Sequence, residues 1–154
     1  MGFNIVLIEP EIPTNTGNIG RLAMATSSKL HLVKPFGFEI DDSRLKRAGL
    51  DYWQHLEPMI YESSEQFFEL NKDADMCFFS SHGEKNYWDI EFHEDLFLVF
   101  GKESVGLSEE ITSQNSDRLY KIPLYSDKVR SLNLANAVGI TAYEGLRQVS
   151  LKTV

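Results

Sequence analysis

The sequence predicts an α/β fold in which a mostly parallel β-sheet is flanked by helices on both faces. Two observations predict this fold, and a third predicts a single domain. Short runs that are apolar throughout, such as residues 5–8 and 96–100, alternate with segments of helical periodicity. Strands of this uniformly apolar kind are typical of parallel sheets with both faces covered. The 154 residues contain no internal repeat and no Gly/Ser-rich or Pro-rich linker, so we expect a single domain, residues 1–154.

The first half of the chain is expected to hold two strands and three helices. In chain order they are a strand at 3–8, a helix at 19–26, a strand at 29–34, a short basic helix at 43–48 and a helix at 63–71. Pro10 and Pro13 belong to a loop that ends the first strand, and Pro35 ends the second, because proline cannot donate to a ladder. Ser63 or Ser64 is expected to cap the last of these helices.

The second half is expected to hold three strands and two helices. They are strands at 76–79, 96–100 and 119–124, a short helix that begins at Ser108, and a helix at 134–149. Cys77 lies within an apolar strand and is expected to be a small core residue. The last helix is the clearest, because an apolar stripe runs along it, formed by Leu134, Val138, Ala142, Leu146 and Val149.

The composition excludes several classes of protein. With 42% hydrophobic and 25% charged residues, the chain is neither a disordered nor a collagen-like sequence. Its one cysteine cannot form an intramolecular disulfide, which favours a reducing compartment, and we expect the cytoplasm. No apolar run approaches the roughly 20 residues of a membrane span, and the N-terminus does not have the pattern of a signal peptide. The four histidines lack metal-ligand spacing, so neither a membrane nor a metal is expected.

The net charge of −8 is unevenly distributed. Residues 1–50 carry six Lys/Arg and five Asp/Glu, a net of +1, and residues 118–154 carry six and two, a net of +4. Residues 51–117 carry three and sixteen, a net of −13. The total argues against a nucleic-acid partner, and the acidic middle can serve solubility alone. If the two ends meet in space, however, a basic surface can exist on an acidic protein.

Three polar loops follow predicted strands, and the carboxyl ends of strands in such sheets bind ligands. The loops span residues 13–21, 100–108 and 122–136. In the first, Arg21 lies about one turn into a predicted helix whose N-terminal N–H groups suit a phosphate or carboxylate. In the second, Gly101 lets a ligand approach the backbone closely, and Glu103 lies at the sheet edge. In the third, Ser131 and Asn133 flank the start of the last helix.

Each loop also has a purely structural interpretation. The first can be a helix start with a solvent-facing arginine, and the second a turn with an N-cap at Ser108. Serine and asparagine at a helix start, such as Ser131 and Asn133, are more often caps than catalysts. The sequence contains neither a Walker A motif nor a full dinucleotide-binding fingerprint. Taken one at a time, the loops therefore leave the function open.

Taken together and in this order, the three loops resemble the three motifs of the SPOUT RNA methyltransferases. The matching segments are Asn15-Thr16-Gly17-Asn18-Ile19-Gly20-Arg21, Phe100-Gly101-Lys102-Glu103-Ser104-Val105-Gly106-Leu107, and Ile122-Pro123 with Ser131-Leu132-Asn133-Leu134-Ala135-Asn136. The resemblance covers nearly the whole chain. It is strongest to the minimal single-domain members, which methylate the wobble nucleotide, cytidine or uridine 34, of certain leucine tRNAs on its ribose 2′-hydroxyl.

The resemblance implies a fold, a cofactor and partners that periodicity alone does not predict. The C-terminal part of the sheet would thread into a deep trefoil knot, a feature nearly absent from other proteins. The knot would form a pocket for S-adenosylmethionine, which leaves as S-adenosylhomocysteine. The protein would be a homodimer in which each active site draws on both chains. Its substrate would be the anticodon loop of a tRNA.

The resemblance also assigns roles to single residues. Arg21 matches the arginine beside the target 2′-hydroxyl, and Asn15 matches the asparagine that helps to shape that site. Glu103 matches the acid of the second motif, while Ser131 and Asn133 match the serine and asparagine of the third. These five are the expected catalytic residues. The residues expected to bind the cofactor are Phe79, Gly101, Ile122 and Ser131 through their backbone, and Leu132 beside the adenine.

Methyl transfer to a hydroxyl requires that its proton be removed. An arginine has a reference pKa of about 12.5 or above, so making one a base near neutrality would cost roughly 7 kcal/mol. We therefore expect Arg21 to stabilise the developing alkoxide or to bind the adjacent phosphate, while the proton leaves through water, phosphate or Ser131. The expected RNA contacts are basic side chains, namely Arg21, Arg44, Lys46, Arg47, Lys128 and Arg130.

Three alternatives remain open at this point. The first is a 2′-O-methyltransferase of another tRNA or rRNA site, which only substrate assays separate. The second is a protein that binds cofactor and RNA without turnover, which the intact set of motif residues disfavours. The third is a flavodoxin-like domain that binds a phosphate at residues 14–20. That reading would fail if S-adenosylmethionine bound and mononucleotides did not.

Overall fold

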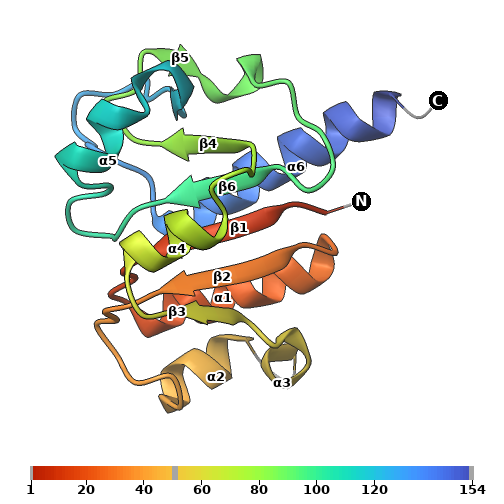
Figure 1. Ribbon diagram of the computed structural model, residues 1–154, viewed down its shortest axis with the longest axis vertical. Helices are drawn as coiled ribbons and strands as arrows, with labels where there is room; N and C mark the ends of the chain where they lie inside the picture. Colours follow the sequence, from red (N-terminus) through yellow and green to blue (C-terminus); the bar gives the residue numbers. More distant parts are fainter. Residues whose placement is uncertain (1, 50–51, 153–154) are drawn as a thin grey trace.

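A computed structural model describes residues 2–49 and 52–152. Within them, seven strands form one sheet in the order β3-β2-β1-β6-β4-β7-β5, and every pairing between these strands is parallel (Figure 1). The strands are β1 (Asn4–Ile8), β2 (Lys29–Val33), β3 (Met59–Tyr61), β4 (Met76–Phe79), β5 (Lys85–Asn86), β6 (Phe97–Phe100) and β7 (Leu119–Lys121). The predicted α/β class with a mostly parallel sheet is confirmed.

Helices cover both faces of this sheet. They are α1 (Pro13–Ala25), α2 (Ser43–Gly49), α3 (Trp53–Leu56), α4 (Ser64–Leu70), α5 (Glu109–Gln114) and α6 (Leu134–Lys152), with short 3-10 turns at Tyr87–Asp89 and Ser116–Arg118. One face packs against α1 and α6, and the other packs against α4 and α5. None of the helices in the described part of the chain is long and apolar enough to cross a membrane.

Residues 5–8 of the central strand β1 show why the inner strands of the sheet are largely apolar. Ile5 and Leu7 point into the cluster under α1 and α6, while Val6 and Ile8 point into the cluster under α4. All four are buried, with 0–4% of each residue exposed. Successive side chains of a strand alternate between faces, so a strand covered on both sides needs apolar residues at every position. Cys77 on β4 is likewise buried, as predicted, and burial raises the pKa of its thiol to about 12.

Most predicted elements are confirmed, with small shifts at their ends. The predicted strand at 119–124 stops at Lys121, because Pro123 has no N–H to donate. Ser63 and Ser108 cap α4 and α5, accepting hydrogen bonds from the backbone of Gln66 and Ile111. Three short elements, β3, β5 and α3, have no counterpart in the sequence-based prediction.

The first helix is a correction to the prediction. We expected a loop over residues 13–18 and a helix from Ile19, whereas α1 begins at Pro13. A proline in the first turn loses no helical hydrogen bond, so Pro13 starts the helix instead of preceding it. Gly20 lies inside the helix and serves packing rather than a turn, since a Cβ there would lie 2.8 Å from the Trp53 ring. Arg21 is consequently about two turns from the helix start, not one.

The strand order places two loops side by side. From β1 the chain proceeds through β2 to β3 on one side, whereas β6 pairs with β1 on the other side. The segments that follow β1 and β6 therefore leave the same edge of the sheet at the point where the strand order reverses. In open parallel sheets, ligands bind in the crevice at this point.

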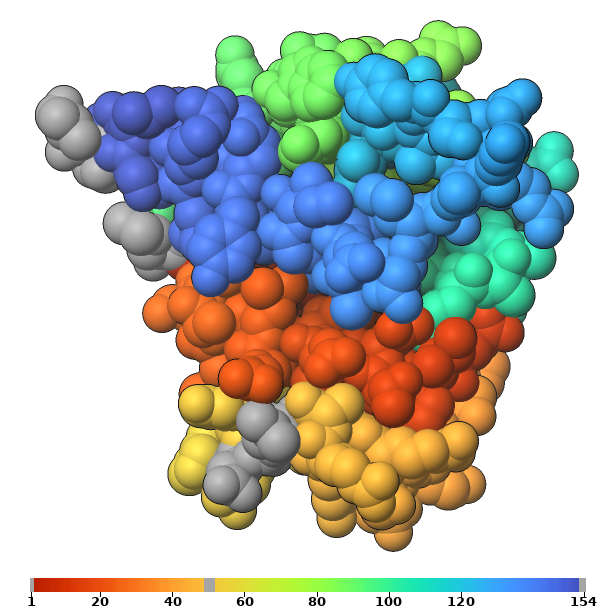
Figure 2. Space-filling model, turned by 180° about the vertical axis from the view of Figure 1, so that it is seen from behind, coloured from red at the N-terminus to blue at the C-terminus, as the bar shows by residue number. Residues whose placement is uncertain are grey.

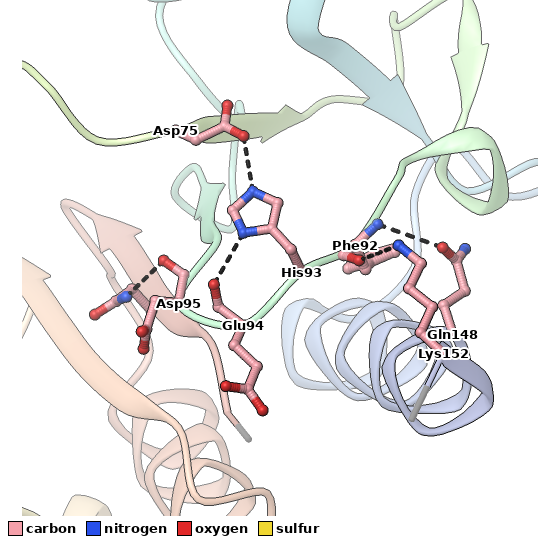
Figure 3. A network of polar contacts seen from close by, with 8 residues as sticks. Asp75, Phe92, His93, Glu94, Asp95, Gln148 and Lys152 are labelled. Carbon is pink, nitrogen blue, oxygen red and sulfur yellow. Dashed lines mark hydrogen bonds and ion pairs between the residues drawn. The ribbon is translucent and has the colours of Figure 1, made fainter. Parts of the chain in front are cut away.

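The opposite edge of the sheet is tied together by polar contacts (Figure 3). His93 Nε2 donates to Asp75 Oδ2 at 2.8 Å, and this hydrogen bond raises the pKa of His93. Lys152 Nζ donates to the Phe92 carbonyl at 2.9 Å, and the Phe92 N–H donates to Gln148 Oε1 at 3.3 Å. The segment before β6 is thus anchored between β4 and the end of α6.

His31 on β2 is a buried polar residue among the apolar residues Leu30, Leu32 and Val33. Only 2% of it is exposed, and burial lowers its pKa to about 4. Its Nε2 lies 2.8 Å from Asn4 Oδ1, and its Nδ1 lies 2.9 Å from the Tyr61 hydroxyl. Since Asn4 Oδ1 can only accept, we assign the neutral tautomer with the proton on Nε2.

We predict that His31 makes the protein less stable in acid. The unfolded chain takes up a proton near pH 6.5 and the folded chain only near pH 4. Its contribution to stability is therefore complete above pH 6.5, falls as the pH drops, and has decreased by roughly 3 kcal/mol below pH 4. Urea unfolding of the wild type and of His31→Gln between neutral pH and about pH 4 measures it. Equal pH dependence in the two proteins would contradict the prediction.

Candidate functional site

A cavity of about 690 Å³ opens at the carboxyl ends of β4, β6 and β7. The loops after these strands line it, together with residues 130–132 before α6. Residues 80–82, which the sequence did not single out, are also part of its wall. All the residues predicted to bind the cofactor line this cavity, namely Phe79, Gly101, Ile122, Ser131 and Leu132.

The loop after β6 folds back tightly on itself. Gly106 adopts a φ of +73°, which favours glycine, and its N–H donates to the Lys102 carbonyl at 2.8 Å. A Cβ on Gly101 would lie 2.2 Å from the backbone of Gly106 and Leu107. No side chain can be accommodated at Gly101, because its Cβ would run into the backbone of the returning part of the loop. The tight fold of the loop therefore accounts for the glycine, and close approach of a ligand to the main chain at Gly101 stays a prediction.

Glu103 extends from this loop to the segment before α1. Its carboxylate accepts from the N–H groups of Glu11 and Ile12, both at 2.8 Å, and from Asn15 Nδ2 at 3.2 Å. The side chain of Ile12, at the N-cap of α1, provides no hydrogen bond. The start of a helix favours a negative charge, and Glu103 provides that charge at α1 from a loop that is distant in the sequence. Its contacts make it a residue that fixes the geometry of the site.

Glu11 makes the reciprocal contact with the loop that carries Glu103. Its Oε1 accepts from the Ser104 N–H at 2.8 Å, and hydrogen bonds from Ser104 lower the pKa of the Glu11 carboxyl. The loops after β1 and β6 are thus joined by two carboxylates that each bind the other loop's backbone. We call this pair, Glu11 and Glu103, the carboxylate clasp. Sequence reasoning missed Glu11, and only its place between Pro10 and Pro13 could have drawn attention to it.

Asn15 and Asn133 join the third loop to the clasp. Asn133 Nδ2 donates to Asn15 Oδ1 at 3.1 Å, while Asn15 Nδ2 donates to Glu103. Asn133 also caps α6, because its Oδ1 accepts from the Asn136 N–H at 3.2 Å. The predicted cap at Asn133 is therefore confirmed, while its predicted catalytic role stays a prediction. Three of the five predicted catalytic residues form one hydrogen-bonded chain.

The other two predicted catalytic residues are placed differently. Ser131 is exposed and lines the cavity. Arg21 is also exposed, but it lies six residues after the buried Asn15 and so faces another side of α1. Its guanidinium lies 5.6 Å from the centre of the Tyr52 ring. Within one chain, Arg21 is therefore not part of the group formed by Asn15, Glu103 and Asn133.

The two mildly basic thirds of the sequence meet on one face of the molecule. Figure 2 shows α6 and the segment before it lying directly against α1. Arg130 lines the cavity, and Lys128 lies exposed on the same segment. Arg44 on α2 is already engaged, because Nε and Nη2 donate to both oxygens of Asp42 at 3.2 and 3.0 Å. Its charge is largely matched within the chain, which weakens it as an RNA contact.

Two further features bear on the chemistry. A second cavity of about 460 Å³ lies on the other face of the sheet between α4 and α5, and it contains none of the predicted site residues. In residues 2–49 and 52–152, no three His, Cys, Asp or Glu side chains are grouped so that they could hold a metal ion. The cavity after β4, β6 and β7 is therefore the candidate site.

Comparison with known proteins gives close similarity over the whole chain. A profile of the SpoU rRNA Methylase family matches residues 2–143. A tRNA (cytidine(34)-2′-O)-methyltransferase from Saccharophagus degradans is 41% identical over 148 residues, which cover 96% of each chain. A protein from Geobacillus stearothermophilus, provisionally given the same name, is 42% identical over 153 residues, 97% of each chain.

Solved structures give the same result. One, from work on 2-OH methylation of C/U34 on tRNA, is 43% identical with a TM-score of 0.91, and the match covers 99% of this chain and 97% of the other. The SpoU methyltransferase AviRb from Streptomyces viridochromogenes, in complex with AdoMet, has a TM-score of 0.78 at 23% identity. That match covers 94% of this chain and 57% of AviRb, and it shows a shared fold.

We predict that Glu103→Gln destabilises the protein and loosens the start of α1. An amide keeps one acceptor oxygen but turns an N–H group towards backbone donors, which should lower the free energy of unfolding by about 1–3 kcal/mol. Urea unfolding measures this loss, and hydrogen exchange at residues 11–16 locates it. Glu84→Gln, at an exposed position, makes the same charge change and is the control. Equal stability of the two variants would show that the clasp does not hold the loops together.

Proposed function

The chain belongs to the SpoU rRNA methylase family, and from that membership we propose that it is a tRNA methyltransferase. It transfers a methyl group from S-adenosylmethionine to the ribose 2′-hydroxyl of the wobble nucleotide, cytidine or uridine 34, of leucine tRNAs. Relatives more than 40% identical over nearly the full length of both chains bear the name of this activity, which supports the choice among RNA sites. The observation that carries the proposal is the convergence of all predicted cofactor residues on one cavity.

The cavity fits S-adenosylmethionine in three respects. Its volume of about 690 Å³ is within the range of ligand pockets, roughly 300–1,000 Å³. Gly101 lines the cavity without a side chain, and Ile122 and Leu132 are half-buried apolar side chains suited to the adenine ring. When bound, S-adenosylmethionine supplies an electrophilic methyl group, and S-adenosylhomocysteine is the product. Phe79, Gly101, Ile122, Ser131 and Leu132 would hold it.

The chain's own residues then have separate tasks. Glu103, Asn15 and Asn133 fix the loops after β1 and β6 and the start of α6 relative to one another. Alignment of this kind contributes about 7–11 kcal/mol to reactions between well-oriented groups. Arg21 stabilises the alkoxide that develops on the 2′-oxygen, or binds the adjacent phosphate. Ser131, at the cavity, offers a path for the proton.

We further propose that the active protein is a homodimer with sites shared between chains. Arg21 lies away from the clasp in its own chain, so in the proposed dimer the Arg21 guanidinium reaches the cavity of the other copy. The helices α1 and α6 lie side by side on one face of the molecule (Figure 2), and both carry exposed apolar side chains for this contact: Met24, Ile140 and Tyr143 are 37%, 39% and 54% exposed. Apolar groups gathered on one face favour association.

The trefoil knot is part of the same proposal. The segment between β7 and α6, residues 122–133, contributes Ile122, Leu124 and residues 130–132 to the cavity that also contains the loop after β6. In the knot we propose, this segment passes through the loop formed by the preceding strands. The cavity would then be enclosed where this segment crosses that loop, so the same crossing would create both the knot and the cofactor pocket.

The proposed function is tested by transfer of tritium from labelled S-adenosylmethionine to bulk tRNA that lacks ribose methylation at the wobble position. Nuclease mapping then locates the label. We expect it on the 2′-oxygen of nucleotide 34 of leucine tRNAs. Label elsewhere would assign the enzyme to another RNA site. Cofactor binding by calorimetry with no label on any RNA would make it a binding protein, and no cofactor binding would contradict the proposal altogether.

Variants of Arg21 test its role in the chemistry. We predict that Arg21→Ala lowers kcat by about 10²–10³-fold, the usual loss when a donor to a developing oxyanion is removed. Arg21→Lys keeps the charge but loses the planar pair of donors, so kcat should still fall by about tenfold. Arg147→Lys, on the exposed surface of α6 and paired with Glu144, is the control. Near-normal turnover of Arg21→Lys would show that no guanidinium is required.

A further inference from the structure

Tyr52 stands beside Arg21 and has no assigned role. The residue is 46% exposed, and its ring centre lies 5.6 Å from the guanidinium carbon of Arg21. This distance is typical of a cation–π contact. The ring is thus an exposed aromatic surface next to the residue proposed to act at the target ribose.

The position of Tyr52 relative to α1 is fixed by its neighbours. Tyr52 precedes α3, whose Trp53 and Leu56 pack against Gly20 of α1 and join the core cluster under α1 and α6. Gly20 directly precedes Arg21 in the sequence. The guanidinium is therefore carried by α1 and the ring by the residue before α3, and the two helices are in close contact at this point.

We propose that Tyr52 binds the RNA by stacking on the base of the nucleotide whose ribose is methylated. This inference rests on the proposed function. Loop nucleotides of RNA present unstacked bases, and aromatic rings and arginine planes are the surfaces on which proteins stack such bases. A base is attached to its ribose, so a protein group at the 2′-hydroxyl has the base within a few ångströms. Arg21 at the ribose then places Tyr52 within reach of that base.

Stacking of this kind also explains how one site could accept more than one base. Every base has a π-face, so stacking on Tyr52 would hold a cytidine or a uridine without hydrogen bonds to either. The ring would fix the plane of the nucleotide, and Arg21 would act on its sugar or phosphate. Tyr52 is thus a binding residue and takes no part in the transfer of the proton or the methyl group.

The test uses three variants and two substrates. Tyr52→Ala removes the ring, Tyr52→Phe keeps it, and Trp88→Ala removes a comparably exposed ring, 44%, elsewhere on the surface. The substrates are a tRNA anticodon stem-loop and the same RNA with an abasic site at the methylated nucleotide. Calorimetric binding of S-adenosylmethionine and thermal unfolding report whether each variant keeps its fold and its cofactor pocket.

We expect Tyr52→Ala to raise the KM for the stem-loop by between about 5-fold and about 150-fold, the range for loss of one stacked base. Cofactor binding should be unchanged, and both Tyr52→Phe and Trp88→Ala should stay within about twofold of wild type. On the abasic RNA, wild type and Tyr52→Ala should have equal KM, because the partner of the ring is gone.

Two results would overturn the inference and leave the proposed function intact. One is wild-type KM for Tyr52→Ala on the stem-loop. The other is an equal loss for Tyr52→Ala on both RNAs, which would show that the ring acts only by holding Arg21. If the wild type methylates neither tRNA nor stem-loop, the proposed function has failed, and this inference is overturned with it.

Discussion

The carboxylate of Glu103 holds the site together at the point where the strand order of the sheet reverses. It accepts from two backbone N–H groups before α1 and from Asn15, while Glu11 binds the backbone of the loop that carries Glu103. Charge-assisted hydrogen bonds are stronger than neutral ones, and here they replace the missing side-chain cap of α1. The start of α1, and with it the orientation of Asn15 and Asn133, depends on this contact.

The same helix carries two groups that face different ways. Asn15 donates to Glu103 of the clasp, whereas Arg21 lies farther along α1, beside the ring of Tyr52. A rigid helix fixed at its start by Glu103 and farther along by Trp53 holds both at a constant separation. In the proposed dimer, the start of α1 organises its own chain's cavity while Arg21 and Tyr52 serve the cavity of the other chain.

The sequence predicts the elements whose local hydrophobic pattern is strong. It does not predict the elements and contacts that depend on residues far apart in the chain. The runs at residues 5–8 of β1 and along β4 and β6 are apolar at every position, so they were predictable. The edge strand β5 is only Lys85–Asn86 and pairs because β7 lies beside it. The glycines of the first motif favoured the prediction of a loop over residues 13–18, whereas packing makes this segment the start of α1. The partners of Glu103 lie 91 and 92 residues away, and no local spacing encodes them.

The central claim, a site built from two chains, is tested most directly by mixing two inactive variants. Arg21→Ala removes the guanidinium, and Leu132→Trp fills the cavity, so each homodimer should lack a working site. After the two are unfolded and refolded together, a mixed dimer has one site with an intact Arg21 and an intact cavity. The account predicts that methyl transfer to tRNA returns on mixing. Mixed dimers that form, as seen by native mass spectrometry, but stay inactive would contradict it.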